Sequence, residues 1–185
     1  STDRRTVRLC DVMTGKPREP AVKHTADVAA VQLNQTPARQ THERQLLLVD
    51  RNDELWLYLC GTAEGHKLHT QVDSACWNET SEALCAIADG RLLVWGYPRV
   101  AFTDRDLLPG TLTTKDGAEF GQLAQVASFR GTKIVVRRAD GAQVTATVAP
   151  YSDMLHEYGS QHRWDEAVGV CRFVEDRGCW CALAS

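Results

Sequence analysis

The 185-residue sequence lacks three features that would each point to a common class of function. It has no apolar run longer than a few residues, which argues against membrane insertion. Its formal net charge of −3 provides no basic field for nucleic acid or anionic lipid. It contains neither GxxxxGK[ST] nor GxGxxG, the glycine motifs that bind phosphates. We therefore expect no membrane insertion, no nucleic-acid partner and no cofactor.

A disulfide framework and a secretory leader are also missing from the pattern. Seven cysteines, an odd number, are scattered through strand-like and helix-like segments, and no charged-then-apolar leader opens the chain. This distribution is typical of small buried residues in a reducing compartment. We expect an intracellular protein, with 43% apolar residues sufficient for a core of ordinary size.

The sequence does contain a repeat. In four segments a polar turn precedes a short run with apolar residues at alternate positions. The segments are RRTVRLCD (4–11), NDELWLYL (52–59), DGRLLVWG (89–96) and GTKIVVRR (131–138). Their aligned positions lie 48, 37 and 42 residues apart, around the ~40–45 residues of a four-stranded propeller blade.

Further alternating runs precede the second and third segments, and this alternation predicts additional strands. They are VAAVQLN (28–34), RQLLLVD (44–50), VDSACWN (72–78) and EALCAIA (82–88). Each unit is therefore predicted to be a meander of antiparallel strands. The Asp-Gly pairs at 89–90 and 140–141 favour tight hairpins, because glycine adopts positive φ without steric cost.

The first 34 residues resemble the junction of two WD repeats. TVRLCDVMTGK resembles the third strand of such a repeat, with Cys10 in the usual place of Trp and Asp11 as the Asp of the dipeptide. KHTADVAAVQLN fits the following loop and first strand, which makes His24 the buried, hydrogen-bonded histidine of that repeat. Because the first two strands of the opening repeat are absent, we expect that residue 1 is not the natural N-terminus and that the chain is a fragment.

After Pro150 the spacing of apolar residues changes to three and four. Ser152 is predicted to cap a helix that Gly159 ends, and a third helix is predicted to begin near Cys179. Between them, HRWDEAVGVCRFVED carries an apolar stripe of Trp164, Ala167, Val168, Cys171 and Val174. Such helix pairs resemble TPR-like solenoid units, which need stacked neighbours. We expect a mainly β chain, with the last blades of a WD40-type β-propeller at 1–149 and the first helices of an α-solenoid at 150–185.

The combined motifs resemble one family over nearly the whole chain. They include MTGKP, QLLLVDRNDEL, DGRLLVWGYP, SFRGTKIVVRRADG, LHEY and RWDEAVGVCRFVED. These resemble the family of intraflagellar transport protein eighty, a WD-repeat subunit of the ciliary transport complex B. The resemblance implies two propellers followed by helical repeats, with this chain spanning the end of the second propeller. Gly96 departs from an expected aromatic residue, and Gly169-Val170 departs from an expected Arg-Leu.

The resemblance further implies a non-enzymatic scaffold or adaptor in the peripheral half of complex B. Its partners would be other complex B subunits and, indirectly, kinesin and dynein motors, and it would reside in the cilium or flagellum, the basal body and the cytoplasm. Formation of a homo-oligomer stays open as a further possibility. Two alternatives also stay open, namely a WD-repeat and solenoid subunit of another vesicle coat or trafficking complex, and a zinc-binding module.

The zinc alternative rests on one stretch, CGTAEGHKLHTQVDSAC. Its candidate ligands are Cys60, His66, His69 and Cys76. The gap between its histidines is shorter than in the usual zinc-finger pattern, so strand cysteines and solvated loop histidines are the favoured interpretation. No catalytic residue is predicted, because no nucleophile motif accompanies any serine.

Surface contacts remain as the predicted mode of action. Aromatic residues and arginine dominate protein interfaces, and the candidates here are Tyr97, Arg99, Arg105, Arg163 and Trp164. Three other tryptophans in strand-like runs, Trp56, Trp77 and Trp95, are expected in the core.

Overall fold

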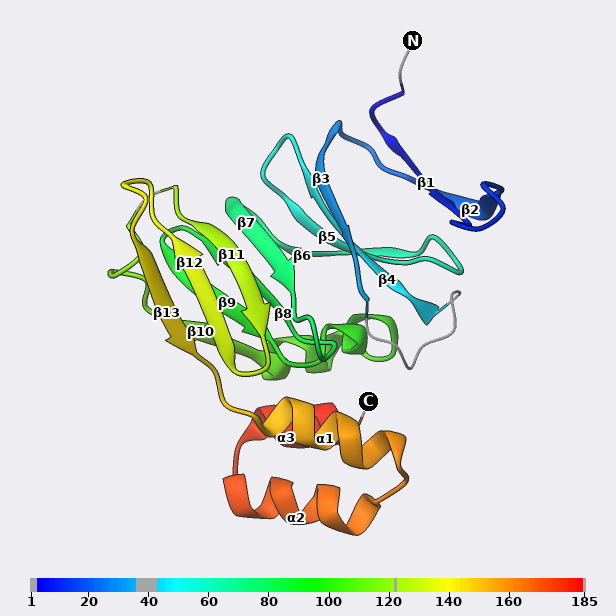
Figure 1. Cartoon of the computed structure of the whole chain (residues 1–185). Coiled ribbons are helices and arrows are strands. Elements are labelled where there is room, and N and C mark those ends of the chain that lie inside the picture. Colours follow the sequence, from blue (N-terminus) through cyan, green and yellow to red (C-terminus); the bar gives the residue numbers. More distant parts are fainter. Residues whose placement is uncertain (1–2, 36–42, 122, 185) are drawn as a thin grey trace. The chain divides into compact units, whose positions relative to one another are not determined.

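A computed structural model describes residues 3–35, 43–121 and 123–184. These residues form antiparallel sheets followed by three helices (Figure 1). Contacts divide the chain into two compact units, Ser1–Val72 and Asp73–Ser185.

The first unit contains a hairpin and a four-stranded sheet. The hairpin joins β1 (Thr6–Cys10) and β2 (Pro17–Lys23), and the sheet runs in chain order through β3 (Val28–Leu33), β4 (Gln45–Asp50), β5 (Leu55–Leu59) and β6 (Gly65–His69). Its core brings Val22 of the hairpin against Leu46, Leu48 and Tyr58 of the sheet. The hairpin therefore covers one face of the sheet.

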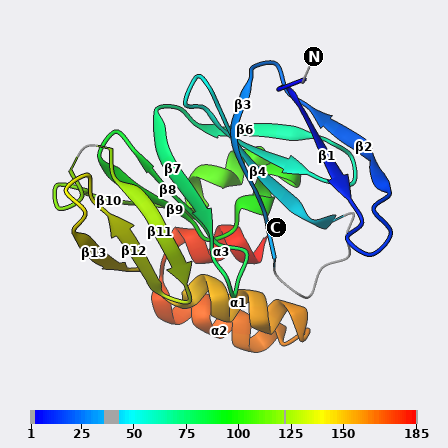
Figure 2. The ribbon, with the colours of Figure 1, turned by 45° about the horizontal axis from the view of Figure 1, so that its top comes forward.

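The second unit contains two further sheets, which lie beside each other in Figures 1 and 2. One consists of β7 (Val72–Trp77), β8 (Leu84–Ala88), β9 (Arg91–Trp95) and β10 (Leu112–Lys115), and the other of β11 (Gln125–Arg130), β12 (Lys133–Arg137) and β13 (Gln143–Thr147). Two 3-10 helices, η2 (Pro98–Phe102) and η3 (Arg105–Thr111), connect β9 to β10. The shared core includes Ile87 and Leu92 from the first sheet and Phe129 and Ile134 from the second.

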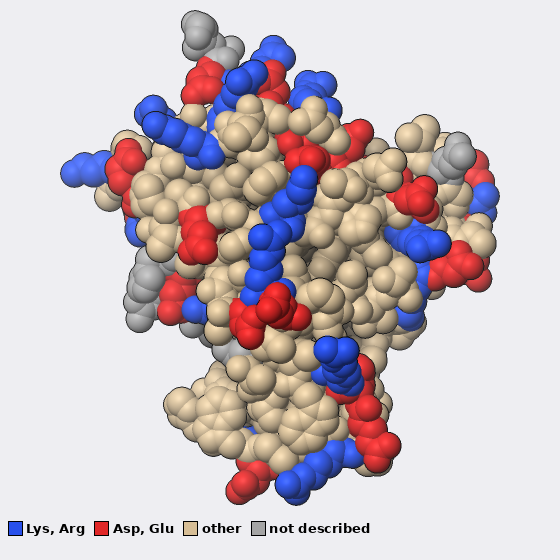
Figure 3. Space-filling view, turned by 180° about the vertical axis from the view of Figure 1, so that it is seen from behind, with Lys and Arg blue, Asp and Glu red and all other residues tan. Residues whose placement is uncertain are grey.

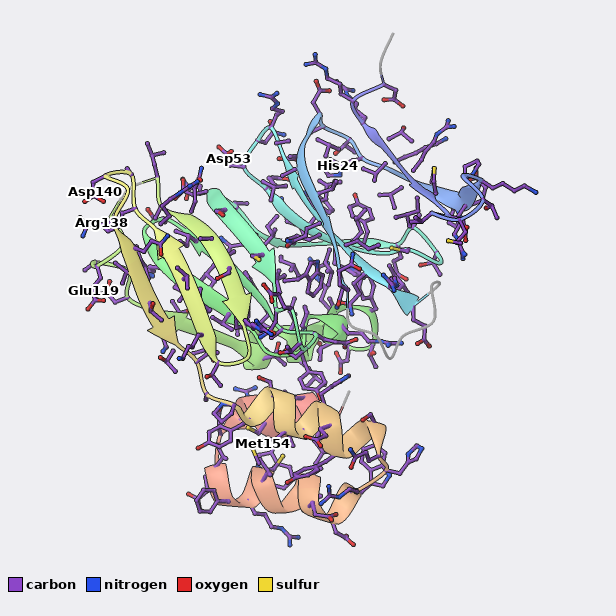
Figure 4. All side chains as sticks on the ribbon, in the orientation of Figure 1. His24, Asp53, Glu119, Arg138, Asp140 and Met154 are labelled. Atoms are coloured by element: carbon purple, nitrogen blue, oxygen red, sulfur yellow. The ribbon has the colours of Figure 1, made fainter. Side chains whose placement is uncertain are left out.

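The alternating runs predict the strands well. The four repeat segments contain β1, β5, β9 and β12, and the four upstream runs contain β3, β4, β7 and β8. At the β8–β9 turn, Asp89 and Gly90 both adopt positive φ, 48° and 67°, which the Asp-Gly pair predicts. At the tip of the β12–β13 hairpin, Arg138 pairs with Asp140 at 3.2 Å (Figure 4). The expectation of antiparallel propeller-type sheets followed by helices is confirmed.

The C-terminal helices are α1 (Tyr151–Ser160), α2 (Trp164–Val174) and α3 (Arg177–Leu183). They pack around Leu155, Ala167, Cys171 and Cys179. No helix in the described ranges is both long and apolar enough to cross a membrane.

Two details of the first helix differ from prediction. The N-cap of α1 is Pro150, without a side-chain cap, and Ser152 lies inside the helix. A Cβ at Gly96 would lie 3.0 Å from the Ser152 Cβ, so this side chain packs against the end of β9 instead of capping. The helix also continues through Gly159 to Ser160, beyond its predicted end.

Candidate functional site

A buried polar network links three elements of the first unit. His24, directly after β2 (Figure 4), lies 2.8 Å through Nδ1 from the Tyr58 hydroxyl on β5 and 3.0 Å through Nε2 from Asp50 Oδ2 at the end of β4. The second oxygen of Asp50 accepts hydrogen bonds from the backbone N–H groups of Asn52 and Glu54, at 2.8 and 3.0 Å. The network therefore ties the loop after β2 to the β4–β5 turn and to β5.

The carboxylate of Asp50 is buried, and hydrogen bonds to both of its oxygens stabilise its ionised form. Burial acts to raise the pKa of Asp50, but the hydrogen bonds from His24 and from the two backbone N–H groups outweigh it, so the pKa lies below its ordinary value of 3.8. Burial, assisted by the Asp50 charge, raises the pKa of the Tyr58 hydroxyl. All three side chains are buried, so the arrangement offers no group to a substrate and serves to join strands.

Gly65 makes room for this arrangement. Gly65 on β6 pairs with Tyr58 on β5, and a Cβ at Gly65 would lie 2.2 Å from the Tyr58 ring. The ring lies over the glycine, and its hydroxyl thereby reaches His24. The rings of Trp56 and His24 meet in a T-shaped arrangement, with their centroids 5.1 Å apart.

Asp11 organises the turn that follows β1. Its Oδ1 accepts from the backbone N–H groups of Met13 and Thr14 and from the Thr14 hydroxyl, and its Oδ2 accepts from Arg18 at 2.9 Å. The Arg18 hydrogen bond, followed by those from Thr14, lowers the pKa of Asp11 to about 2. Asp11 is thus a turn-capping residue, and the turn exposes Met13 and its neighbour Val12 almost completely.

The candidate zinc ligands are not arranged as the sequence predicted. Cys76 lies on β7 as expected, but Cys60 follows the end of β5, and His66 and His69 are half-buried on β6 instead of in a solvated loop. Cys60 is buried, which raises the pKa of its thiol to about 11. His66 lies 3.1 Å from Glu64, His69 lies 2.6 Å from the Thr70 carbonyl oxygen, and Cys76 donates to the Trp77 carbonyl oxygen. Across residues 3–35, 43–121 and 123–184, no group of three or more His, Cys, Asp or Glu side chains is placed to hold a metal ion.

The seven cysteines are free thiols, five of them buried. Cys179 packs in the core of the helices, whereas Cys181 contacts η3, where a Cβ at Gly110 would lie 2.5 Å from its Sγ. The two thiols of the CWC stretch therefore face different neighbours.

The predicted contact residues near η2 and η3 occupy different environments. Tyr97 packs against the helical core, with its ring centroid 6.3 Å from that of His156. Arg99 is half-buried, and burial lowers its pKa. Arg105 is exposed in the first turn of η3. Trp95, in contrast, is 1% exposed at the end of β9.

Arg163 and Trp164 come together at the α1–α2 turn. The Arg163 guanidinium lies 4.6 Å from the Tyr158 ring centroid and 3.0 Å from Glu166. The Trp164 ring lies 6.1 Å from that of His162 and is 53% exposed. The sequence assigned Trp164 to the apolar stripe of the helix, and this was wrong. As the first residue of α2 it extends beyond the helical core, against Gly159.

Two exposed aromatic residues were missed by sequence reasoning. Phe173 is 84% exposed on α2, and Trp180 is 41% exposed on α3. Phe173 lies between Arg172 and Val174, outside the predicted apolar stripe. Its position off the stripe was the signal in the sequence that this aromatic side chain would be exposed.

Comparisons with known proteins place the chain in a family. Residues 1–151 match the family described as the IFT80 second beta-propeller. The intraflagellar transport protein 80 homologs of Mus musculus and Rattus norvegicus are each 35% identical over 189 residues. Each match covers 99% of this chain and 24% of the relative, so the chain spans about a quarter of the length of these relatives.

Solved structures agree on the fold. The computationally designed Ika4 protein matches with a TM-score of 0.51 and 17% identity, over 78% of this chain and 80% of that one. The designed Ika8 protein matches with a TM-score of 0.53 and 16% identity, over 79% and 41%. These likenesses support the fold alone, whereas the family match extends over most of the sequence. The chain belongs to the IFT80 second beta-propeller family.

Proposed function

We propose that this chain is part of a non-catalytic scaffold subunit of intraflagellar transport complex B, which supports train assembly and cilium formation through protein contacts. The observation that carries the proposal is the family match over residues 1–151, together with relatives named as intraflagellar transport protein 80 homologs. The expected partners are other complex B subunits and, through them, kinesin and dynein motors. The expected location is the cilium, the basal body and the cytoplasm.

The burial and hydrogen bonding of the titratable residues favour a scaffold over an enzyme. His24, Asp50 and Tyr58 are buried and hydrogen-bonded to one another, and Asp11 is occupied by a turn and an arginine. Buried polar groups that are hydrogen-bonded to one another stabilise the strands that carry them, and the burial of His24, Asp50 and Tyr58 separates them from a substrate. We propose that 1–149 is propeller and that the helices after it begin a helical repeat.

The surface supports protein binding. Positive and negative side chains are interspersed over the face in Figure 3, with much of the visible helical surface uncharged. We propose as a contact patch the four residues Tyr158, His162, Arg163 and Trp164, called the α1–α2 patch. It combines the residue types that dominate interface energies with an arginine already held against a tyrosine ring.

The proposed function is tested by affinity purification of the tagged full-length protein from ciliated cells, with mass spectrometry of the co-purifying proteins. Recovery of other complex B subunits is the expected result. Recovery of a vesicle coat would overturn the proposal and favour a trafficking role outside the cilium. Recovery of no partner would also overturn it.

The α1–α2 patch is tested in the same assay with Arg163→Ala/Trp164→Ala. The matched control, Arg172→Ala/Phe173→Ala, likewise removes an arginine and an aromatic residue, but from the other end of α2, where both are exposed. The patch variant is expected to lose at least one partner at unchanged melting temperature, whereas the control keeps them all. Unchanged recovery with the patch variant would exclude this patch.

A further inference from the structure

A cavity of about 270 Å³, partly open to solvent, lies within the second unit. It is bounded by the sheet β7–β10, by the sheet β11–β13 and by the helices α1 and α3. Apolar side chains supply much of its wall, among them Val94, Phe129, Val148 and Leu155. A concave apolar pocket with a few converging polar groups is the usual form of a small-ligand site.

The polar side of the cavity comes from alternate residues around β10. Thr113 and Lys115 line it, because alternate residues of a strand point to the same face. Thr111, the last residue of η3, lines it as well. Thr113 pairs in register with Val94 on β9, which also lines the cavity. The strand thus presents the Thr113 hydroxyl and the Lys115 ammonium along one wall, whereas the buried Thr111 hydroxyl donates to the Leu108 carbonyl oxygen.

Lys115 is the cation of this wall, and it is half-buried. Its ammonium donates to the Thr147 carbonyl oxygen, and within the described part of the chain it makes no ion pair with a carboxylate. An ammonium has three donors, so two stay available. Asp176, the anion of the lining, accepts from the Gly178 N–H at 3.1 Å as the N-cap of α3. The lining therefore combines apolar side chains with one ammonium and one carboxylate, and the carboxylate is engaged at the start of α3.

The volume limits the size of the ligand. A cavity of about 150 Å³ holds benzene, which corresponds to ~25 Å³ for each non-hydrogen atom. A volume of about 270 Å³ therefore accommodates about eleven such atoms. We propose that this cavity binds a small apolar carboxylate, with its aromatic or branched aliphatic body between the two sheets and its carboxylate paired with Lys115. This inference is independent of the scaffold function.

The test titrates the chain with 3-phenylpropionate and follows backbone amide signals by NMR. The neutral probe is 3-phenylpropionamide, which has the same size and shape. We expect shifts at residues that line the cavity, and a dissociation constant at least about tenfold lower for the carboxylate, the usual effect of a charge-assisted hydrogen bond. An absence of shifts at saturating probe, or equal affinity for both probes, would overturn the proposal.

Two variants and a control locate the interaction. Lys115→Met is expected to remove the preference for the carboxylate and to leave binding of the amide unchanged. Lys133→Met, which removes an exposed lysine of β12 outside the cavity, is expected to keep the preference. Thr113→Trp fills the cavity from an exposed strand position and is expected to abolish binding of both probes. A native amide spectrum establishes folding of each variant, and a preference retained in Lys115→Met would contradict the proposed pairing.

Discussion

The sheets β3–β6 and β7–β10 share one antiparallel strand order but are stabilised in different ways. In β3–β6, the buried His24, Asp50 and Tyr58 join a loop, a turn and a strand by hydrogen bonds. In β7–β10, all five residues of β8 are apolar and buried. The alignment that pairs Leu55 with Leu92 also pairs Tyr58 with Trp95, which is buried and, among the residues that the structure describes, forms no comparable network.

This difference shows that the same strand pattern supports two kinds of core. A polar network is directional, so a variant of similar volume that lacks the hydrogen bond leaves a buried group unpaired. An apolar core depends on volume and shape, so added or removed atoms matter most. The two regions should therefore respond to different substitutions.

His24→Leu should have the largest effect, because it leaves the Asp50 carboxylate and the Tyr58 hydroxyl without their shared partner. We expect the free energy of unfolding to fall by about 3 kcal/mol. Chemical denaturation measures the change. The control is His66→Leu, which removes a half-buried histidine paired with Glu64 in the same unit and should cost about 0.5 kcal/mol or less. Equal losses in both variants would contradict a special role of the network.

Gly178→Ala should have the second largest effect. It tests the packing of the second unit. A Cβ at Gly178 would lie 2.8 Å from the carbonyl oxygen of Gly110, so α3 and η3 would have to separate. We expect a loss of about 2 kcal/mol, although alanine favours a helix. Thermal unfolding followed by circular dichroism measures it, and an unchanged or raised melting temperature would show that this contact is loose.

Gly169→Ala should act in the opposite direction. Gly169 lies inside α2, and a Cβ there meets no atom within 4 Å. The same substitution should therefore raise the free energy of unfolding by about 1 kcal/mol, the helix preference of alanine over glycine. It serves as the matched control for Gly178, since both glycines are helical and differ in their surroundings. A loss of stability here would mean that the exposed side of α2 is packed.

The smallest effect should be a dependence on pH. The folded-state pKa of Asp50 lies below its ordinary value of 3.8, so its ionised form stabilises the fold above pH 3.8 and this contribution disappears as the pH falls through the folded pKa. The difference in unfolding free energy between the wild-type chain and Asp50→Asn should be constant above pH 3.8 and shrink below it. Denaturation curves at several pH values measure this difference. A difference that grows in acid would contradict the sign.

The sequence predicts what depends on local periodicity. Alternation of apolar residues locates the central strands, such as β4 and β9, and the Asp-Gly pair specifies the turn at Asp89. His24 matches the position of the buried histidine that precedes the first strand of a WD repeat, and a buried histidine needs hydrogen-bond partners. Its partners, Asp50 and Tyr58, lie 26 and 34 residues away, and no spacing rule identifies them.

The remaining features depend on tertiary contacts. Ser152 has the identity of a helix cap, but its packing against Gly96 places it within α1. Trp164 has the spacing of a core residue, but as the first residue of α2 it extends past the core. The cavity combines residues from three strands, two α-helices and the 3-10 helix η3, so it has no signature in the sequence.

Live imaging of the fluorescently tagged full-length protein in ciliated cells tests the scaffold role most directly. A subunit of the transport complex is expected to enter cilia and move in both directions along the axoneme, together with a labelled complex B subunit. Exclusion from cilia, or a ciliary signal that does not move with that subunit, would contradict the proposed function.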